Sequence, residues 1–336
     1  MSYINGKIIK DKDGKDYTFK ASSGSKTRVT VSWKEAAKEI VVDGGVYNGS
    51  IPGFERQIFA FDPGQKPSYK VTGASDKAKI AAYGRVNGSI DNGIITLSYA
   101  PDKKPLMPRG DDSMDQEEEF PAIAAVDITD GDAVKTLTVI ISPEIRLIPA
   151  TAAKVVNKAE LRSSGDESIQ PRLWCTQKGD GAVFPCENLS KGEYAVFALA
   201  RFAVDANREG ACFELKDTAR NLQPFRIASP VNPTADYLFA PFGTSGRRSR
   251  WKWDCGYRPD LQLPYNGWII RMFGEPGEDG YEVRLSGDVP TGAELAALLI
   301  IKSPGLEARA DLRKILFGLN CDPAHVKSNQ IKSKES

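Results

Sequence analysis

The chain has 336 residues, which is enough for about two domains of ordinary size. Its 45 basic residues nearly cancel its 44 acidic residues, which argues against a strong overall attraction to nucleic acid or to an anionic membrane. The longest apolar run, 295–301, is far shorter than the roughly 18 to 20 residues of a membrane span, and residues 1–15 lack the apolar core of a signal peptide. We therefore expect cytoplasmic synthesis without a signal peptide, and no membrane span.

The N-terminal region shows one hairpin signal and one helix signal. Lys7 to Phe19 combines apolar and alternating residues around the turn pair Asp13-Gly14, which predicts a β-hairpin. Ser32 and Glu35 have the spacing of a capping box, which predicts a short helix behind them. The apolar face of that helix would consist of Ala36, Ala37, Ile40 and Val41.

Strand signals dominate the next hundred residues. Turn signals at Val86-Asn87-Gly88 and Asp91-Asn92-Gly93 frame short alternating segments such as Ile94 to Tyr99. Val134 to Ser142 is a β-branched run that Pro143 ends. This pattern predicts an all-β sandwich or barrel.

Acidic residues gather in a stretch between Arg109 and Glu119, where mutual repulsion predicts an exposed loop. The loop could instead hold a cation or dock a basic partner. Two aspartate clusters, 11–16 and 127–132, resemble calcium loops, but their glycines and the missing closing glutamate do not fit an EF-hand. Both clusters are therefore interpreted as β-turns.

The composition changes near residue 165. All five cysteines, the only histidine and four of the five tryptophans lie beyond that point. We predict a β-rich domain over 1–150, a connector over 151–168, a second β-rich domain over 169–320 and a polar tail over 321–336. Thr151 to Arg162 is predicted to be a helix within the connector. The number of cysteines is odd, their spacings are wide and no CxxC pair occurs, which favours buried reduced thiols. Cys175 and Cys186 are the one pair close enough in sequence to suggest a disulfide.

The second half carries an unusual aromatic and basic segment, 245–257. In an extended strand it would place aromatic residues on one face and cationic residues on the other. One interpretation is a strand whose aromatic face fills the core; the other is an exposed platform that stacks sugars or bases. The candidate binding residues are Arg247, Arg248, Arg250, Trp251, Lys252, Trp253, Tyr257, Tyr265 and Trp268.

The last hundred residues contain an ambiguous apolar run and a clear helix pattern. Thr291 to Lys302 fits a buried strand and a buried helix equally well. Ser303 and Pro304 then form a good helix start, and an apolar stripe predicts a C-terminal helix that docks on a sheet. The stripe consists of Leu312, Ile315, Leu316 and Leu319.

Most catalytic constellations are excluded by the residue inventory. A histidine-dependent triad would need His325, which lies on the polar tail without a rigid neighbour to orient its imidazole. The scattered cysteines and single histidine argue against a zinc or iron site, and no phosphate-binding glycine loop occurs. We expect no cofactor and no metal. A pair of carboxylates could still hydrolyse glycosides, but the sequence nominates no pair.

These observations predict a mainly β fold, with two β-rich domains of sandwich or barrel type, a few short helices and one C-terminal helix. The leading hypothesis is a non-enzymatic structural or interaction protein that forms homo- or hetero-oligomers with other protein subunits in a virion, phage tail or injection-type appendage. The first alternative is a carbohydrate-binding module that uses the aromatic residues at 251–268. The second alternative is a glycoside hydrolase or lyase with paired carboxylates.

Overall fold

The structure is a computed structural model, and it describes part of the chain in detail. The described ranges are 3–4, 7–8, 17–20, 26–29, 39–48, 56–106, 120–163, 171–187, 189, 194–202, 212–216, 225–226, 238–241 and 279–302. None of these residues forms an α-helix, and the only helical element among them is a single 3-10 turn, η1 (Ala150–Ala152). The mainly β prediction is therefore confirmed.

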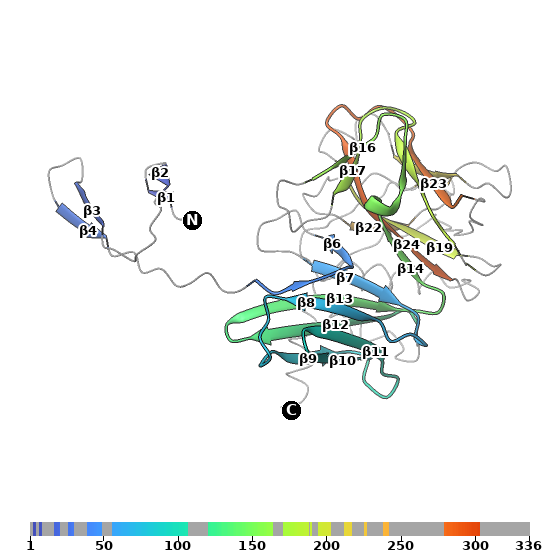
Figure 1. The fold of residues 1–336 in the computed structure, drawn as a ribbon. Coiled ribbons are helices and arrows are strands. Elements are labelled where there is room, and N and C mark those ends of the chain that lie inside the picture. The colour runs from blue at the N-terminus through green and yellow to red at the C-terminus, as the bar shows by residue number, and fades with distance from the viewer. Residues whose placement is uncertain are drawn as a thin grey trace, which may run out of the picture.

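Four sheets form the body of the described structure, and we call them sheets I to IV (Figure 1). The strand order in sheet I is β10 (Val86–Asp91), β11 (Ile94–Tyr99), β8 (Ser68–Thr72), β5 (Val41–Val42). The order in sheet II is β6 (Val46–Asn48), β7 (Arg56–Phe61), β13 (Ala133–Ile141), β12 (Ala122–Asp130), β9 (Lys79–Tyr83). All described pairs within these two sheets are antiparallel except β7 with β13.

Sheets III and IV are built from strands later in the chain. The order in sheet III is β16 (Glu160–Arg162), β17 (Arg172–Cys175), β24 (Ala293–Lys302), β19 (Tyr194–Phe202), β22 (Leu238–Pro241), with β14 (Arg146–Pro149) also paired to β24. The order in sheet IV is β15 (Lys154–Val156), β18 (Gly181–Phe184), β23 (Tyr281–Leu285), β20 (Phe213–Lys216), β21 (Phe225–Arg226). All described pairs here are antiparallel.

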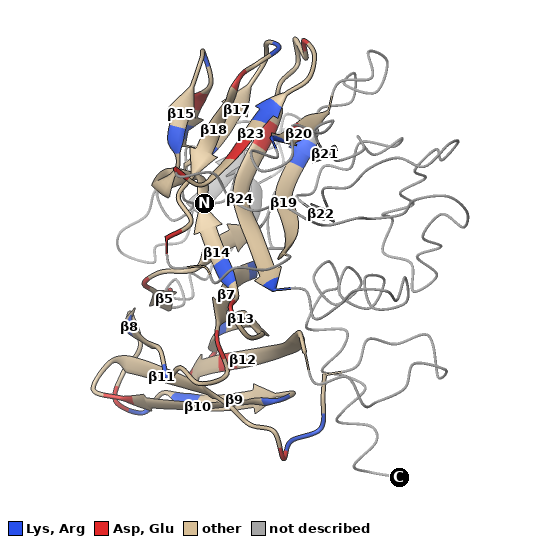
Figure 2. Ribbon diagram, turned by 90° about the vertical axis from the view of Figure 1, so that its right-hand side faces the viewer, with Lys and Arg blue, Asp and Glu red and all other residues tan. Residues whose placement is uncertain are grey.

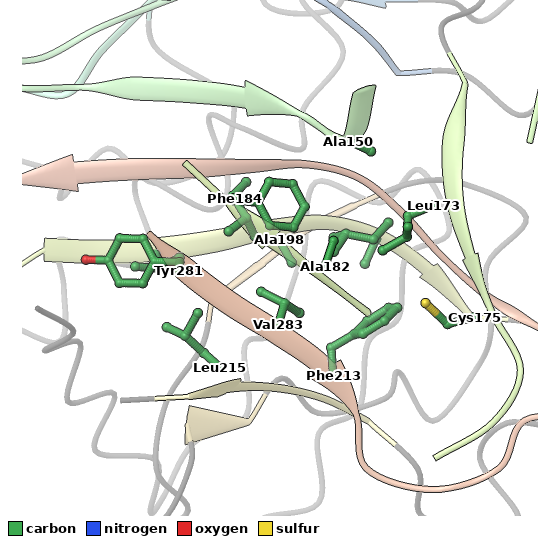
Figure 3. Packing of buried hydrophobic residues seen from close by; sticks show 14 of the residues in the cluster. Ala150, Leu173, Cys175, Ala182, Phe184, Ala198, Phe213, Leu215, Tyr281 and Val283 are labelled. Carbon is green, nitrogen blue, oxygen red and sulfur yellow. The ribbon is translucent and has the colours of Figure 1, made fainter. Parts of the chain in front are cut away.

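Three apolar cores join the four sheets into one stack. The first lies between sheets I and II and contains Phe59, Phe61 and Leu97, all almost fully buried. The third lies between sheets III and IV, where Phe184, Phe213 and other buried side chains converge (Figure 3). A second core lies between sheets II and III and joins the two pairs of sheets. Its buried members are Val46, Ile58, Ile140, Ile145, Ala195, Phe197, Leu199, Ala296, Ala297, Leu299 and Ile301.

Where the second core lies, sheets II and III are therefore buried on both faces. Successive residues of a strand point to opposite faces, so a strand with two dry faces needs an unbroken apolar run. Strand β24 meets this requirement: Leu298 and Ile300 pack into the third core, whereas Leu299 and Ile301 pack into the second. The ambiguous run at 291–302 is thus a strand, and β24 runs across the direction of β12 in sheet II (Figure 2).

A β-bulge in β24 lies where its pairing changes from one neighbouring strand, β17, to another, β14. The register with β19 shifts between Leu199 and Ala200, and Ala296 is the extra residue of β24 at this shift. Strand β17 pairs with residues 293–295, and β14 pairs with residues 297–300. The bulge therefore falls where one neighbouring strand ends and the other begins, as is typical of bulges that re-aim side chains.

The junction between sheets II and III is held by polar contacts as well as by the second core. Glu144 lies between β13 and β14 with a positive φ of 49°. Its backbone N–H donates to Asp62 Oδ2 at 2.9 Å, and its carboxylate accepts from Tyr194 Oη at 3.4 Å and pairs with Lys302. The hydrogen bond to Glu144 raises the pKa of Lys302. Glu144 thus connects the end of β7 with the strands of sheet III.

Two turn predictions had different outcomes. Asn92 and Gly93 both have positive φ values, 49° and 73°, as expected for a type I′ hairpin turn between β10 and β11. The predicted turn at 86–88 is wrong, because these residues open β10. Gly88 lies over the first core, where a Cβ would meet Ile80, Leu97 and Val126 at 3.1 to 3.5 Å.

The predicted N-terminal hairpin and two helix predictions need correction. Strand β2 (Lys7–Ile8) pairs with β1 (Tyr3–Ile4), and β3 (Tyr17–Lys20) pairs with β4 (Lys26–Val29), so the described strands β2 and β3 belong to separate sheets and do not pair as predicted. The segment 151–162, predicted to be a helix, instead forms most of η1 and the strands β15 and β16. The reason is that β15 pairs with β18 in sheet IV and β16 pairs with β17 in sheet III. Val41, placed at the end of the early helix, belongs to β5.

Other predictions lie outside the described residues. They are the capping box at Ser32 and Glu35, the acidic stretch 109–119, the C-terminal helix after Ser303 and the tail over 321–336. The two-domain division also stays a prediction. Along the chain, the strands of sheet II end at Ile141, and those of sheet III begin at Arg146, the first residue of β14.

Candidate functional site

The candidate binding residues from the sequence, Arg247 to Trp268, all lie outside the described residues, as does His325. The described part of the chain contains no group of three or more His, Cys, Asp or Glu side chains that could hold a metal ion. Among the described residues, no helix has the length and apolar character needed to cross a membrane.

One row of side chains crosses sheet III from β16 to β19. Glu160 pairs with Trp174, Trp174 with Glu294, and Glu294 with Arg201. Because directly paired residues project from the same face of a sheet, these four side chains lie on one face in a line. The row is opposite to the face of β17 and β24 that packs into the third core.

Trp174 is the aromatic centre of this row and is only partly buried. Its six-membered ring lies against Gly292, where an added Cβ would sit 2.1 Å from Cζ2 of the indole. The guanidinium of Arg162 lies over the ring, 4.7 Å from its centroid. The indole is therefore held by the backbone at Gly292 and covered by a cation, as in a cation–π pair.

Ion pairs flank the indole on both sides. Arg162 contacts Glu160 at 2.8 Å, with the two side chains 51% and 61% exposed. Arg201 Nε donates to Glu294 Oε1 at 3.1 Å, and these side chains are less exposed, at 32% and 12%. The exposed pair contributes little to stability and is easily broken, whereas the more buried pair is better fixed.

The row lies close to the place where sheet II meets sheet III. Arg172, two residues before Trp174 on the same face of β17, is buried, and its Nη2 donates to the carbonyl oxygen of Tyr47 in β6 at 3.3 Å. This contact joins two strands that are 125 residues apart in the chain. The row therefore borders the junction instead of being covered by it, since Glu160 and Arg162 are exposed.

The row also bears on the paired-carboxylate hypothesis. Glu160 and Glu294 lie on either side of β17, so their Cα atoms are separated by two strand spacings, roughly 10 Å. Each carboxylate is paired with an arginine, Glu160 with Arg162 and Glu294 with Arg201. The row consequently resembles a surface for polar contacts more than an acid and base pair, and hydrolysis stays a hypothesis without support here.

The described cysteines are thiols, and the suggested bond between Cys175 and Cys186 does not form. Desolvation by burial, with the nearby Asp180 as a second cause, raises the pKa of Cys175 to about 12. Burial likewise raises the pKa of Cys186 to about 11, against smaller opposing effects of a backbone hydrogen bond and Arg146. A thiolate is the reactive form, so both side chains are poor nucleophiles at neutral pH.

This pKa change gives a prediction for reactivity and stability. In a variant with Cys212, Cys255 and Cys321 replaced by serine, we expect Cys175 and Cys186 to react with a thiol reagent at pH 8 only after unfolding. Because the folded Cys175 keeps its proton above its ordinary pKa of 9.0, this residue's contribution to stability should be lost as the pH rises from 9.0 to about 12. Rapid labelling of the folded variant at pH 8 would contradict this expectation.

Trp174 and its neighbours were not among the candidate binding residues predicted from the sequence. The signal was present, because Leu173 and Cys175 alternate with Arg172 and Trp174, which is typical of a strand with one buried face. The partners of the row come from β16, β19 and β24, up to 134 positions apart. Only the strand order of sheet III brings them together.

Comparison with known proteins gives little guidance. No family model matches the chain, and no curated protein matches it. A solved structure, "The structure of CBM51-2 and INT domains from Clostridium perfringens ZmpB", is similar at 9% sequence identity, over 77% of this chain and 48% of that chain, with a TM-score of 0.19. This chain thus matches about half of the length of that structure, and a TM-score this low carries no argument.

Proposed function

We propose that the protein is a non-enzymatic structural or interaction protein that serves as a subunit of a larger assembly, such as a virion, phage tail or injection-type appendage. The observation that supports this best is the second apolar core, which joins sheets II and III and makes a single stack of the four sheets. Interfaces between domains of one chain are usually more polar than this core. A body held together in this way suits a part that carries load or presents surfaces to partners.

The charged side chains of the described residues support the same proposal. Lys302 with Glu144, Arg201 with Glu294, and Lys216 with Glu282 are ion pairs between different elements. Asp180 is buried and binds backbone N–H groups of two turns. These groups have roles in holding the fold, which favours a scaffold over a catalyst.

The experiment for this proposal measures mass in solution. The full chain is purified alone and after co-expression with the products of neighbouring genes, and its mass is measured by light scattering at micromolar concentration. We expect a defined oligomer or a stable complex that co-elutes with a neighbour. A monomer under both conditions would contradict the proposal.

Carbohydrate binding is the second candidate function. The specific observation in its favour is the partly buried Trp174 between two carboxylates on the face of sheet III. Aromatic rings that combine with a few well-placed polar groups are typical of ligand sites. The aromatic residues predicted at 251–268 stay part of this candidate function as a proposal.

A further inference from the structure

We infer that Trp174 is a stacking platform for a neutral pyranose ring and that Arg162 is its displaceable cover. This inference rests on the second candidate function, carbohydrate binding. It assigns that function to a particular row of residues on sheet III, instead of to the aromatic segment that the sequence suggested. Three properties of the row support it: a fixed ring, a weakly held cover and balanced charge.

The indole is fixed before any ligand arrives. Gly292 has a φ of 88°, a backbone conformation that favours glycine, and its missing side chain leaves the space that the indole occupies. A Cβ there would lie within 2.5 Å of three atoms of the indole. A ring that is already positioned loses little conformational freedom on binding, which favours affinity.

The cover over the indole is held by weak interactions. Arg162 lies in the edge position of sheet III among the described strands, and its side chain is 51% exposed. Within the described part of the chain, Arg162 is held by the ion pair with Glu160 and by its position over the ring at 4.7 Å. Exposed ion pairs and exposed cation–π contacts are both weak, so a ligand can displace the guanidinium at small cost.

The charges of the row identify the ligand class. Glu160 and Glu294 can accept hydrogen bonds from a ligand, and Arg201 can donate them. The charges of the two glutamates are balanced by Arg162 and Arg201. Hydroxyl groups both donate and accept, so a neutral sugar can satisfy both kinds of partner. An anionic or cationic ligand would leave one of the two ion pairs without its counter-charge. A pyranose has a ring face for the indole and hydroxyl groups at its edge, which matches this arrangement.

The test measures binding of the full chain to a panel of neutral oligosaccharides, made of glucose, xylose, mannose and N-acetylglucosamine units, by calorimetry. We expect Trp174→Ala to weaken binding by at least about tenfold, the effect typical of losing one aromatic stacking contact. Trp174→Phe should keep part of the affinity. Arg162→Ala should keep or increase affinity, because it uncovers the ring.

Control variants separate binding from folding. Val134→Ala changes a 61% exposed side chain on sheet II and should leave binding unchanged. Thermal melting of each variant shows whether it is folded, and Trp174→Phe keeps the test decisive if Trp174→Ala does not fold. Loss of binding in Trp174→Ala with retention in Val134→Ala and Arg162→Ala would support the inference.

Three results would overturn it in different ways. If the folded wild-type chain binds none of the sugars, carbohydrate binding and this inference both fail. If binding is found and Trp174→Ala leaves it unchanged, the inference fails while carbohydrate binding through other residues stands. If Arg162→Ala abolishes binding, Arg162 is a direct ligand contact and its role as a cover is wrong.

Discussion

Replacing Phe197 with alanine is expected to lower the free energy of unfolding by about 3 to 5 kcal/mol, the usual cost of removing a fully buried phenylalanine. Phe197 lies in the second core, between sheets II and III, and is 0% exposed. The first core, between sheets I and II, and the third core, between sheets III and IV, are unchanged in this variant. We therefore also expect the single unfolding transition to separate into two.

Urea unfolding followed by circular dichroism and by tryptophan fluorescence tests both parts of this prediction. Phe184→Ala is the matched control, because Phe184 is equally buried but lies in the third core. It should destabilise sheets III and IV without removing contacts between sheets II and III. A loss of less than about 1 kcal/mol for Phe197→Ala, or equal splitting of the transitions in both variants, would contradict the role given to the second core.

Replacing Asp180 with alanine is expected to cost about 2 to 4 kcal/mol, because three hydrogen bonds to a carboxylate are lost together. Asp180 is 1% exposed, and its carboxylate accepts the backbone N–H groups of Lys158, Thr176 and Gln177 at 3.2, 3.0 and 2.9 Å. These bonds connect the turn before β16 with the turn that links β17 of sheet III to β18 of sheet IV. The substitution should therefore loosen the edge of sheet III that carries Trp174.

The thermal midpoint and hydrogen exchange at residues 157–163 and 171–187 measure this effect. Asp288→Ala is the matched control: its carboxylate is exposed and accepts one backbone N–H, from Lys178 at 2.8 Å. We expect that control to lose less than about 1 kcal/mol. Asp180→Asn keeps one side-chain acceptor oxygen, so its loss of stability should lie between those of Asp180→Ala and Asp288→Ala. Equal effects of Asp180→Ala and Asp288→Ala would refute the importance of the buried carboxylate.

Parts of the fold could be predicted because their signals are local. The pair Asn92-Gly93 requires positive φ at both positions, and the two flanking strands follow from it. The same reasoning failed at Gly88, where space for neighbouring side chains, and no turn, explains the glycine. The helix prediction for Thr151 to Arg162 was wrong for a related reason, since pairing with strands outside this segment, β17 and β18, outweighs a local helix preference.

The candidate site could not be predicted in the same way. Trp174 has no special motif around it, and its neighbours Glu160, Arg201 and Glu294 come from three other strands. The aromatic segment that attracted attention in the sequence lies outside the described residues. The residues of this surface are not adjacent in the sequence, so only the register of the paired strands shows that they lie together.

The sequence by itself determined that the chain is rich in strands, because alternation, β-branched runs and turn residues act over a few neighbouring positions. It also contained the unbroken apolar run of β24, but it did not show whether that run was a strand or a helix. The tertiary structure decided that β24 is a strand with two dry faces, and that sheets II and III share an apolar core. The physical reason is that burial of a second face depends on what another sheet places against it, which no local pattern specifies.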